Sequence, residues 1–191
     1  MKQFITAFFS LLMLFACTEK TDKKAEQQET NTDSIFLLES KWQNQEGKEI
    51  LLKDLKGKNL VVVMIFTRCQ TACPLLVGDM KKVKAKITEK QLKNTSLVFI
   101  SVDPENDTPE VLKKYAQQHN IYGEPWILLR SDVESTREFA NVLAVKYKKI
   151  SPIVFSHSNI ISVFNKNGEM VSQEEGTVNA EAIAKTVNEL N

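Results

Sequence analysis

The segment that decides the fold is residues 60–74, which reads Leu-Val-Val-Val-Met-Ile-Phe-Thr-Arg-Cys-Gln-Thr-Ala-Cys-Pro. Its first seven residues are apolar and rich in β-branched side chains, so they predict a strand that is buried on both faces. Proline is tolerated in the first turn of a helix, so Pro74 predicts a helix that begins close to Cys73. The segment therefore predicts a strand, a loop and a helix in direct succession.

Two thiols lie in this segment. Cys69 and Cys73 are four residues apart, which is about one helical turn if the turn between them is helical. The partial positive charge of a helix N-terminus favours a thiolate over a thiol. In open α/β sheets, chemistry is found beyond the carboxyl ends of the strands. The sequence therefore predicts two activated sulfurs side by side at the end of a central strand.

The amino-terminal residues 1–16 are typical of a lipoprotein signal peptide. Lys2 supplies a positive start, and the apolar run 4–15 matches a secretory signal and is too short to span a bilayer comfortably. The run ends in Leu-Phe-Ala before Cys17, which resembles a bacterial lipobox. We expect cleavage before Cys17 and a lipid on its sulfur. The alternative is an ordinary signal peptide, or an uncleaved anchor, with an incidental cysteine.

Residues 17–34 are then the lipidated Cys17 and a polar tether, which has almost no apolar residue and is expected to be disordered. This assignment places the protein in the bacterial cell envelope, anchored to a membrane and facing the periplasm. Cys69 and Cys73 remain as a pair outside the cytosol. Such a pair must be kept reduced by a thiol reductant partner, or cycle, or hold a metal. The net charge of +1, with no basic block, argues against nucleic acid as a partner.

Residues 35–191 are expected to form one domain in which strands alternate with helices. The predicted strands are 35–42, 48–52, 60–66, 97–102 and 126–129, followed by a terminal hairpin of 159–164 and 169–172. The predicted helices are 74–90, 109–119, 131–144 and 179–190. This order predicts an α/β, thioredoxin-like fold, with a central, mostly parallel sheet flanked by helices and an N-terminal β-hairpin extension.

Capping residues support three of the helix starts. Thr108 is a predicted N-cap with Pro109 at the first helical position. Ser131 with Glu134 forms a capping-box pattern. Asn179 is the predicted cap of the last helix.

We expect different roles for the two histidines. His119 lies at a predicted helix end, where a surface or capping role is expected. His157 precedes the terminal hairpin, in a loop that faces the cysteine loop in thioredoxin-like folds, so we expect it to be a metal ligand; the alternative is a structural histidine. Two thiolates and one imidazole suit Cu(I) and hold Cu(II) with a further ligand. The unmetallated pair could also close as a disulfide.

Three motifs in order along the chain resemble the Sco/SenC family of copper-binding, thioredoxin-like proteins. They are residues 66–74 around the cysteines, residues 101–109 (Ser-Val-Asp-Pro-Glu-Asn-Asp-Thr-Pro) and His157-Ser158. The resemblance implies that copper is held by Cys69, Cys73 and His157. It also implies a role in assembling the dinuclear copper centre of cytochrome c oxidase, so that the partner is an apo copper protein such as the subunit that carries this centre.

This chain departs from the family pattern at several positions. Arg68 stands where members often have histidine, and residues 70–72 replace a segment that contains Pro-Asp. Ile-Ile-Ser at 160–162 stands in place of Tyr-Leu. None of these departures removes a ligand. Asp103 and Asp107 are expected either to orient the site or to be ordinary loop and helix-start carboxylates.

Two functions from different classes follow. The first is a membrane-anchored metallochaperone that delivers copper to a respiratory copper enzyme. The second is thiol–disulfide exchange by the redox pair Cys69 and Cys73, either to reduce the acceptor's cysteines or as a general envelope oxidoreductase without a copper role. A weaker third option is a peroxide-consuming protein with Cys69 as the reactive thiol, which would not need His157.

Overall fold

The computed structural model describes residues 33–151 and 154–190, without the side chains of residues 151–157. Apart from Asp33 and Ser34, the predicted signal peptide (1–16) and lipidated tether (17–34) lie outside the described residues. No helix in the described part of the chain is long and apolar enough to cross a membrane.

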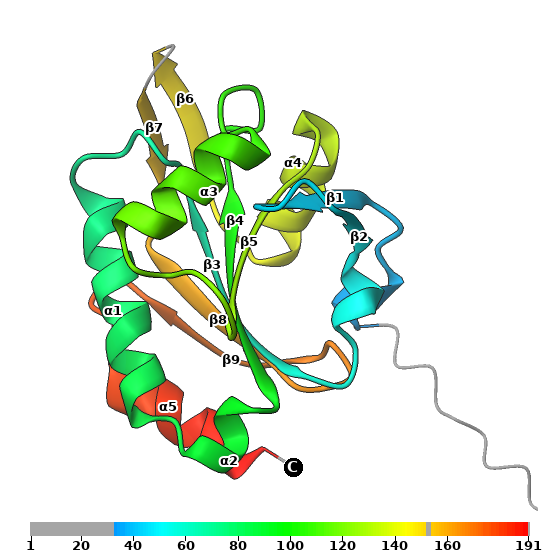
Figure 1. Cartoon of the computed structure of the whole chain (residues 1–191), viewed down its shortest axis with the longest axis vertical. Coiled ribbons are helices and arrows are strands. Elements are labelled where there is room, and N and C mark those ends of the chain that lie inside the picture. Colours follow the sequence, from blue (N-terminus) through cyan, green and yellow to red (C-terminus); the bar gives the residue numbers. More distant parts are fainter. Residues whose placement is uncertain (1–32, 152–153, 191) are drawn as a thin grey trace, which may run out of the picture. The chain divides into compact units, whose positions relative to one another are not determined.

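A seven-stranded sheet forms the centre of the domain, in the order β2-β1-β5-β4-β3-β8-β9 (Figure 1). Its strands are β1 (Lys41–Asn44), β2 (Glu49–Leu51), β3 (Asn59–Ile65), β4 (Thr95–Ser101), β5 (Trp126–Arg130), β8 (Ile160–Phe164) and β9 (Met170–Glu175). The three central strands β3, β4 and β5 are parallel, whereas β1 joins β5, and β8 joins β3, in antiparallel pairs. The sheet is therefore mixed, and the predicted parallel pairing is confined to its middle. The N-terminal hairpin of β1 and β2 is confirmed.

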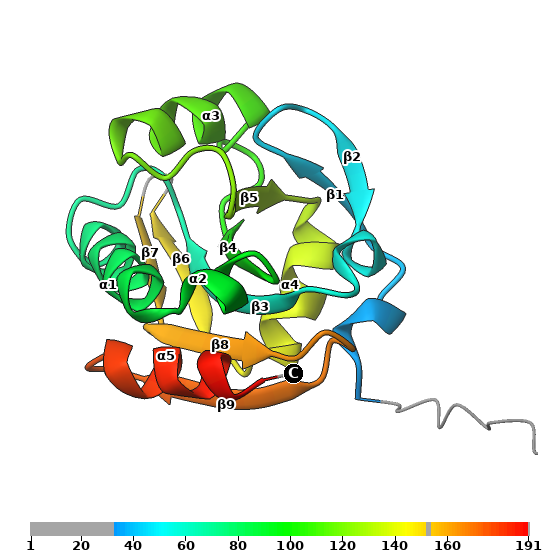
Figure 2. The same cartoon turned by 60° about the horizontal axis from the view of Figure 1, so that its bottom comes forward.

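Helices cover both faces of the sheet. They are α1 (Ala72–Lys86), α2 (Glu89–Leu92), α3 (Pro109–Gln118), α4 (Val133–Val142) and α5 (Ala180–Glu189). Figure 2 shows α1, α3 and α5 on one face and α4 on the other. The placement of α1 and α3 on the same face follows from right-handed crossovers, because each connects a pair of neighbouring parallel strands as the chain moves from β3 through β4 to β5.

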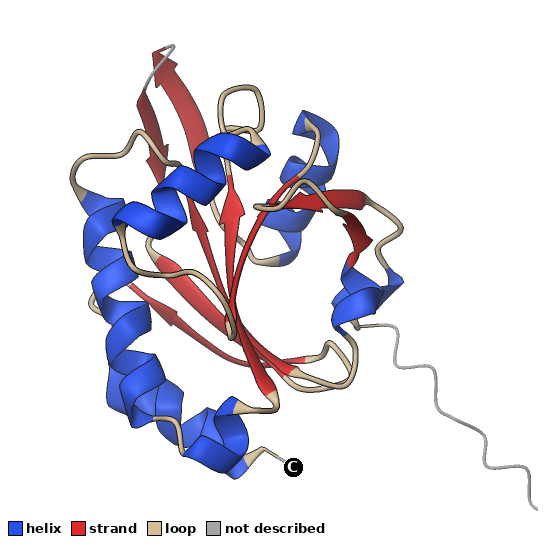
Figure 3. Ribbon diagram, viewed as in Figure 1, coloured by secondary structure: helices blue, strands red, loops and turns tan. Residues whose placement is uncertain are grey.

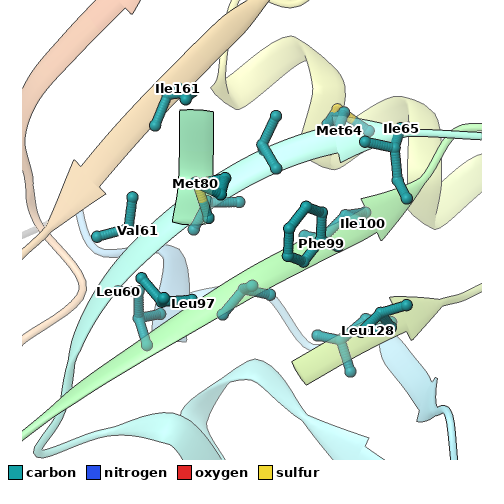
Figure 4. Packing of buried hydrophobic residues seen from close by; sticks show 14 of the residues in the cluster. Leu60, Val61, Met64, Ile65, Met80, Leu97, Phe99, Ile100, Leu128 and Ile161 are labelled. Atoms are coloured by element: carbon teal, nitrogen blue, oxygen red, sulfur yellow. The ribbon is translucent and has the colours of Figure 1, made fainter. Parts of the chain in front are cut away.

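The core lies against the two central strands. All seven residues of β3 and all seven of β4 are buried, as the uninterrupted apolar run predicted for β3. Figure 4 shows Met80 of α1 beside β3, within the cluster of buried hydrophobic side chains. Met80 is fully buried. The strand that leads to the cysteines is therefore buried along its whole length, which gives the loop after it a rigid support.

Several predicted boundaries are wrong, each for a local reason. Instead of a strand over 35–42, the chain forms a 3₁₀-helix, η1 (Ile35–Leu37), because the Ser34 hydroxyl accepts the Phe36 N–H at 3.2 Å and starts a turn. A second 3₁₀-helix, η2 (Leu52–Leu55), follows β2. The predicted helix 74–90 divides into α1 and α2, because Thr88 caps a new helix start.

The caps are confirmed at two of three helices. Thr108 and Asn179 accept backbone N–H groups at the starts of α3 and α5. At α4 the cap is Asp132 and not Ser131, since the Asp132 carboxylate accepts the Ser135 N–H at 2.7 Å. The Ser131 hydroxyl instead donates to the Lys41 carbonyl on β1. Ser131, which the sequence pattern predicted as the cap, therefore makes a tertiary hydrogen bond instead.

A second hairpin stands where the sequence predicted a loop. Strands β6 (Tyr147–Ser151) and β7 (Val154–His157) pair in antiparallel fashion as a separate two-stranded sheet. Figure 3 shows this hairpin projecting at the end of the main sheet where the loop between β3 and α1 also lies. The hairpin therefore approaches the cysteine end of the domain.

Candidate dithiol site

The loop between β3 and α1 carries both thiols. The Cys69 N–H donates to the Phe66 carbonyl at 3.1 Å, which turns the chain directly after the buried strand. Thr71, the residue before α1, makes no side-chain cap. The Cys69 sulfur takes that place instead, because it accepts the Cys73 N–H at 3.3 Å. The predicted helix start near Cys73 is confirmed, and the helix terminus points at the Cys69 sulfur.

The two thiols differ in environment, although both are free cysteines. Cys69 is partly exposed, whereas Cys73 is fully buried. Burial opposes ionisation of Cys69, but N–H groups of Cys73, Thr71 and Ala72 outweigh it and hold the pKa of the Cys69 thiol below its usual range. Burial raises the pKa of the Cys73 thiol far above its usual range, and the charge of Cys69 adds to the effect. The prediction of two activated sulfurs is therefore wrong: only Cys69 is activated.

Asp107 holds the residue at the start of the loop. Its carboxylate accepts the Thr67 N–H at 3.1 Å, the Thr67 hydroxyl at 2.5 Å and the Ser101 hydroxyl at 2.6 Å. Asp107 is fully buried, and burial raises the pKa of this carboxyl despite these three donors. The carboxylate thus links the end of β3 to the end of β4, and the residue that it holds, Thr67, lies two residues before Cys69.

Asp103 makes the matching contact one residue further along. Its carboxylate lies 2.6 Å from the Arg68 guanidinium, whose side chain is 35% exposed. The Asn106 amide donates to the other oxygen of Asp103 at 2.8 Å, and the Ser101 hydroxyl accepts the Asp103 N–H at 3.0 Å. The two carboxylates are therefore more than loop residues, because Asp107 holds Thr67 and Asp103 holds Arg68, the two residues that precede Cys69.

The position of His157 is described for its backbone alone. It is the last residue of β7, where it pairs with Tyr147 of β6. Its side chain lies outside the described part of the structure, so its approach to the sulfurs stays a prediction. Among the described side chains, no three His, Cys, Asp or Glu residues gather as a metal site. His119 follows α3, as predicted, with its ring centroid 4.2 Å from that of Tyr115.

Two residues near the thiols, Thr67 and Tyr115, were not singled out from the sequence, and Arg68 was noted there only as a departure from the family pattern. Thr67 and Arg68 anchor the loop through carboxylates 40 and 35 residues away along the chain. Tyr115 on α3 is buried, and its hydroxyl has no hydrogen-bond partner in the described structure. Burial raises the pKa of Tyr115, with smaller contributions from Cys73, Cys69 and Asp107. The apolar face of α3 indicates burial of Tyr115 but carries no signal that its hydroxyl lies near the thiols.

The donor set is suited to two kinds of chemistry. Two adjacent sulfurs, one accessible as a thiolate, are soft ligands of the type that Cu(I) prefers. The same pair can exchange with a disulfide, because the exposed thiolate is the nucleophile and the buried thiol lies next to it. Fold and site together define a thioredoxin-like domain with a CxxxC dithiol at the end of its central strand.

Comparison with known proteins identifies the family. A sequence model of the family described as SCO1/SenC matches residues 23–191, and the chain therefore belongs to the SCO1/SenC family. The SCO1 protein homolog of Bacillus subtilis is 30% identical over 141 residues, which cover 72% of each chain. The resemblance noted from the three motifs is thus confirmed.

Solved structures agree with this assignment. A SCO1/SenC family lipoprotein from Bacillus anthracis is 30% identical, with a TM-score of 0.72 over 82% of this chain and 95% of that one. ScoI of Bradyrhizobium japonicum, solved with copper bound, is 24% identical, with a TM-score of 0.69 over 80% of this chain and 97% of that one. At this identity the second likeness shows the fold, which is thioredoxin-like as predicted.

Proposed function

We propose that this protein is a lipid-anchored copper-binding protein of the bacterial cell envelope that delivers copper to a respiratory copper enzyme such as cytochrome c oxidase. The observation that carries the proposal is the pair of unequal thiols at the end of β3. Cys69 is accessible and tends to ionise, whereas Cys73 is buried beside it. Copper bound to a Sco protein of the same fold supports the cargo, and a family lipoprotein supports the anchor at Cys17.

Copper would be held by the sulfurs of Cys69 and Cys73 and by the imidazole of His157. The buried thiol must lose its proton on binding, so the affinity falls as the pH falls. Delivery would proceed by ligand exchange. A thiolate of the acceptor displaces the more exposed Cys69 first, and the other ligands then leave in turn.

Thiol–disulfide exchange is a second function that the same asymmetry favours. The Cys69 thiolate attacks a disulfide of the acceptor, forms a mixed disulfide and releases one acceptor thiolate. Cys73 then loses its proton and attacks the Cys69 sulfur, which closes the Cys69–Cys73 disulfide and releases the second acceptor thiolate. The two electrons come from the dithiol, and a thiol reductant partner restores it. The acceptor's cysteines are then ready to take copper.

The two functions are separated by one pair of variants. In the reduced protein, His157→Ala should weaken Cu(I) binding by at least about tenfold, the loss of one good ligand contact, and leave disulfide exchange largely intact. His119→Ala is the matched control and should change neither. Cu(I) affinity is measured by competition with a chromophoric chelator, and exchange by reduction of a small disulfide. An unchanged copper affinity in His157→Ala would remove the support for delivery and leave exchange as the better account.

A further inference from the structure

A groove lies beside the dithiol loop on the side of the domain that carries α4. It has a volume of about 660 Å³ and is bordered by the loop after β4, by α4 and by the start of β6. Residues that line it include Val102, Val133, Arg137, Val145, Lys146 and Lys148. The groove is not used by the proposed copper chemistry, so its composition calls for a separate explanation.

The groove is joined to the dithiol loop by one ion pair. Asp103 lines the groove, and its carboxylate lies 2.6 Å from the guanidinium of Arg68, the residue before Cys69. In Figure 1 the loops after β3 and β4 and the β6–β7 hairpin gather at the same end of the sheet. A molecule in the groove would therefore lie next to the loop that carries the reactive thiol.

The charge of the groove is positive and largely uncompensated. Its two acids are already paired, Asp103 with Arg68 at 2.6 Å and Glu105 with Lys149 at 2.7 Å. Three further cations line it, and within the described residues no hydrogen bond or ion pair engages their side chains: Arg137, Lys146 and Lys148. Since the whole chain has a net charge of only +1, this is a local concentration of positive charge.

On the opposite face of the sheet some lysines are paired with carboxylates, whereas Lys81 and Lys84 of α1 form no ion pair within the described residues. Lys82 and Lys86 on α1 lie 2.9 and 3.2 Å from carboxylates, and Lys185 on α5 lies 3.9 Å from one. Those cations are neutralised by neighbours on the same surface. The three cations of the groove are left to a partner of opposite charge, which is the arrangement that steers an acidic partner to a site.

The groove also has an apolar component. Val102 and Val145 are 2% and 5% exposed, and Val133 is 45% exposed. Val102 and Val145 are thus already covered by the protein, and the exposed apolar surface is that of Val133, which a small inorganic anion bound to the three cations would leave uncovered. A recess with charged walls and apolar contacts is better matched by a short stretch of polypeptide that has acidic side chains and at least one apolar side chain.

We propose that this groove binds an acidic segment of the partner protein, with an apolar side chain placed against Val133, and that this contact brings the partner to Cys69. The proposal rests on the proposed function in one respect, because it supposes that the dithiol acts on a protein. It adds the chemistry by which that protein is recognised.

The test uses a fluorescent peptide and the metal-free, reduced protein. The probe is a short peptide of aspartate and glutamate with two leucines, and binding is followed by fluorescence anisotropy. The double variant Arg137→Glu with Lys148→Glu should weaken binding by at least about tenfold, because two attractions become repulsions. The control is Lys114→Glu, which lies on the exposed face of α3, away from the groove, and has the same charge change per site. This control should weaken peptide binding less than about twofold.

Two further comparisons decide between a peptide site and a simple anion site. Serine in place of the leucines should weaken the peptide several-fold, and phosphate should displace the peptide no better than sodium chloride at equal ionic strength. The proposal is overturned if Lys114→Glu weakens binding as much as the groove variant. It is also overturned if the leucines contribute nothing and phosphate competes specifically.

Copper affinity of the same variants separates this proposal from the proposed function. The groove variant should bind Cu(I) as tightly as the unaltered protein, since neither substituted residue is a proposed ligand. Loss of peptide binding with copper binding intact supports the groove. Peptide binding by a protein that fails to bind copper would retain the groove and reject copper delivery.

Discussion

The unequal thiols lead to a quantitative prediction of reactivity. The perturbation is a pair of single substitutions, Cys69→Ser and Cys73→Ser, each of which leaves one thiol of the pair. Cys73→Ser keeps the backbone N–H that reaches the Cys69 sulfur at 3.3 Å, so the remaining Cys69 should stay reactive. Cys69→Ser leaves a thiol that is fully buried and has a strongly raised pKa, so it should react slowly.

The expected magnitude follows from the fraction of thiolate. The pKa of Cys69 lies below 9.0 and that of Cys73 far above it. Below both pKa values, each unit of difference between the two pKa values changes the ratio of the thiolate fractions about tenfold. A less basic thiolate is also a weaker nucleophile, which reduces the logarithm of the rate ratio by about half. Burial of Cys73 adds a steric barrier. We expect Cys69 to be alkylated at least about a hundredfold faster at pH 7.

The assay is alkylation by iodoacetamide with quantification of each cysteine by peptide mass spectrometry. The rate for Cys69 should rise with pH and reach half of its plateau at a pH below 9.0, because the pKa of this thiol is lowered. In concentrated urea the two thiols should react at similar rates, since the folded environment is lost. Rates for the two folded variants that agree within tenfold would refute the inferred asymmetry.

Two further predictions concern the support of the loop and the anchor. Asp107→Ala leaves the Thr67 N–H and two hydroxyls without their acceptor, so the free energy of unfolding in urea should fall by about 3–5 kcal/mol, whereas the exposed control Glu138→Ala should change it by less than about 0.5 kcal/mol. A loss below about 1 kcal/mol would contradict the anchoring role. Because the pKa of Asp107 is raised, the folded state binds its proton more tightly than the unfolded state does; this proton-linked part of the stability is complete at low pH and is lost as the pH rises through the folded-state pKa, so Asp107→Asn should flatten that decline. Cys17→Ala should release the protein from the membrane fraction, and retention of that variant would indicate an uncleaved anchor.

Much of the fold followed from local patterns. The buried run of β3 and the helix start at Ala72 were predictable because an apolar run and a proline act on their immediate neighbours. The caps at Thr108 and Asn179 were predictable for the same reason. The order of strands and helices then limited the topology to a thioredoxin-like arrangement. The proximity of Cys69 to Cys73 was also local, since only three residues separate them at the start of a helix.

The tertiary structure alone decided which thiol is reactive. Both cysteines have the same local sequence signal, but Cys73 faces the core and Cys69 faces outward at the helix end. The contacts of Thr67 with Asp107, and of Arg68 with Asp103, join segments 40 and 35 residues apart, and parallel pairing of β3 with β4 brings those segments together. The groove and the β6–β7 hairpin depend in the same way on distant segments. A sequence pattern reports what neighbours along the chain favour, whereas burial and charge at this site are set by residues that only the folded sheet makes neighbours.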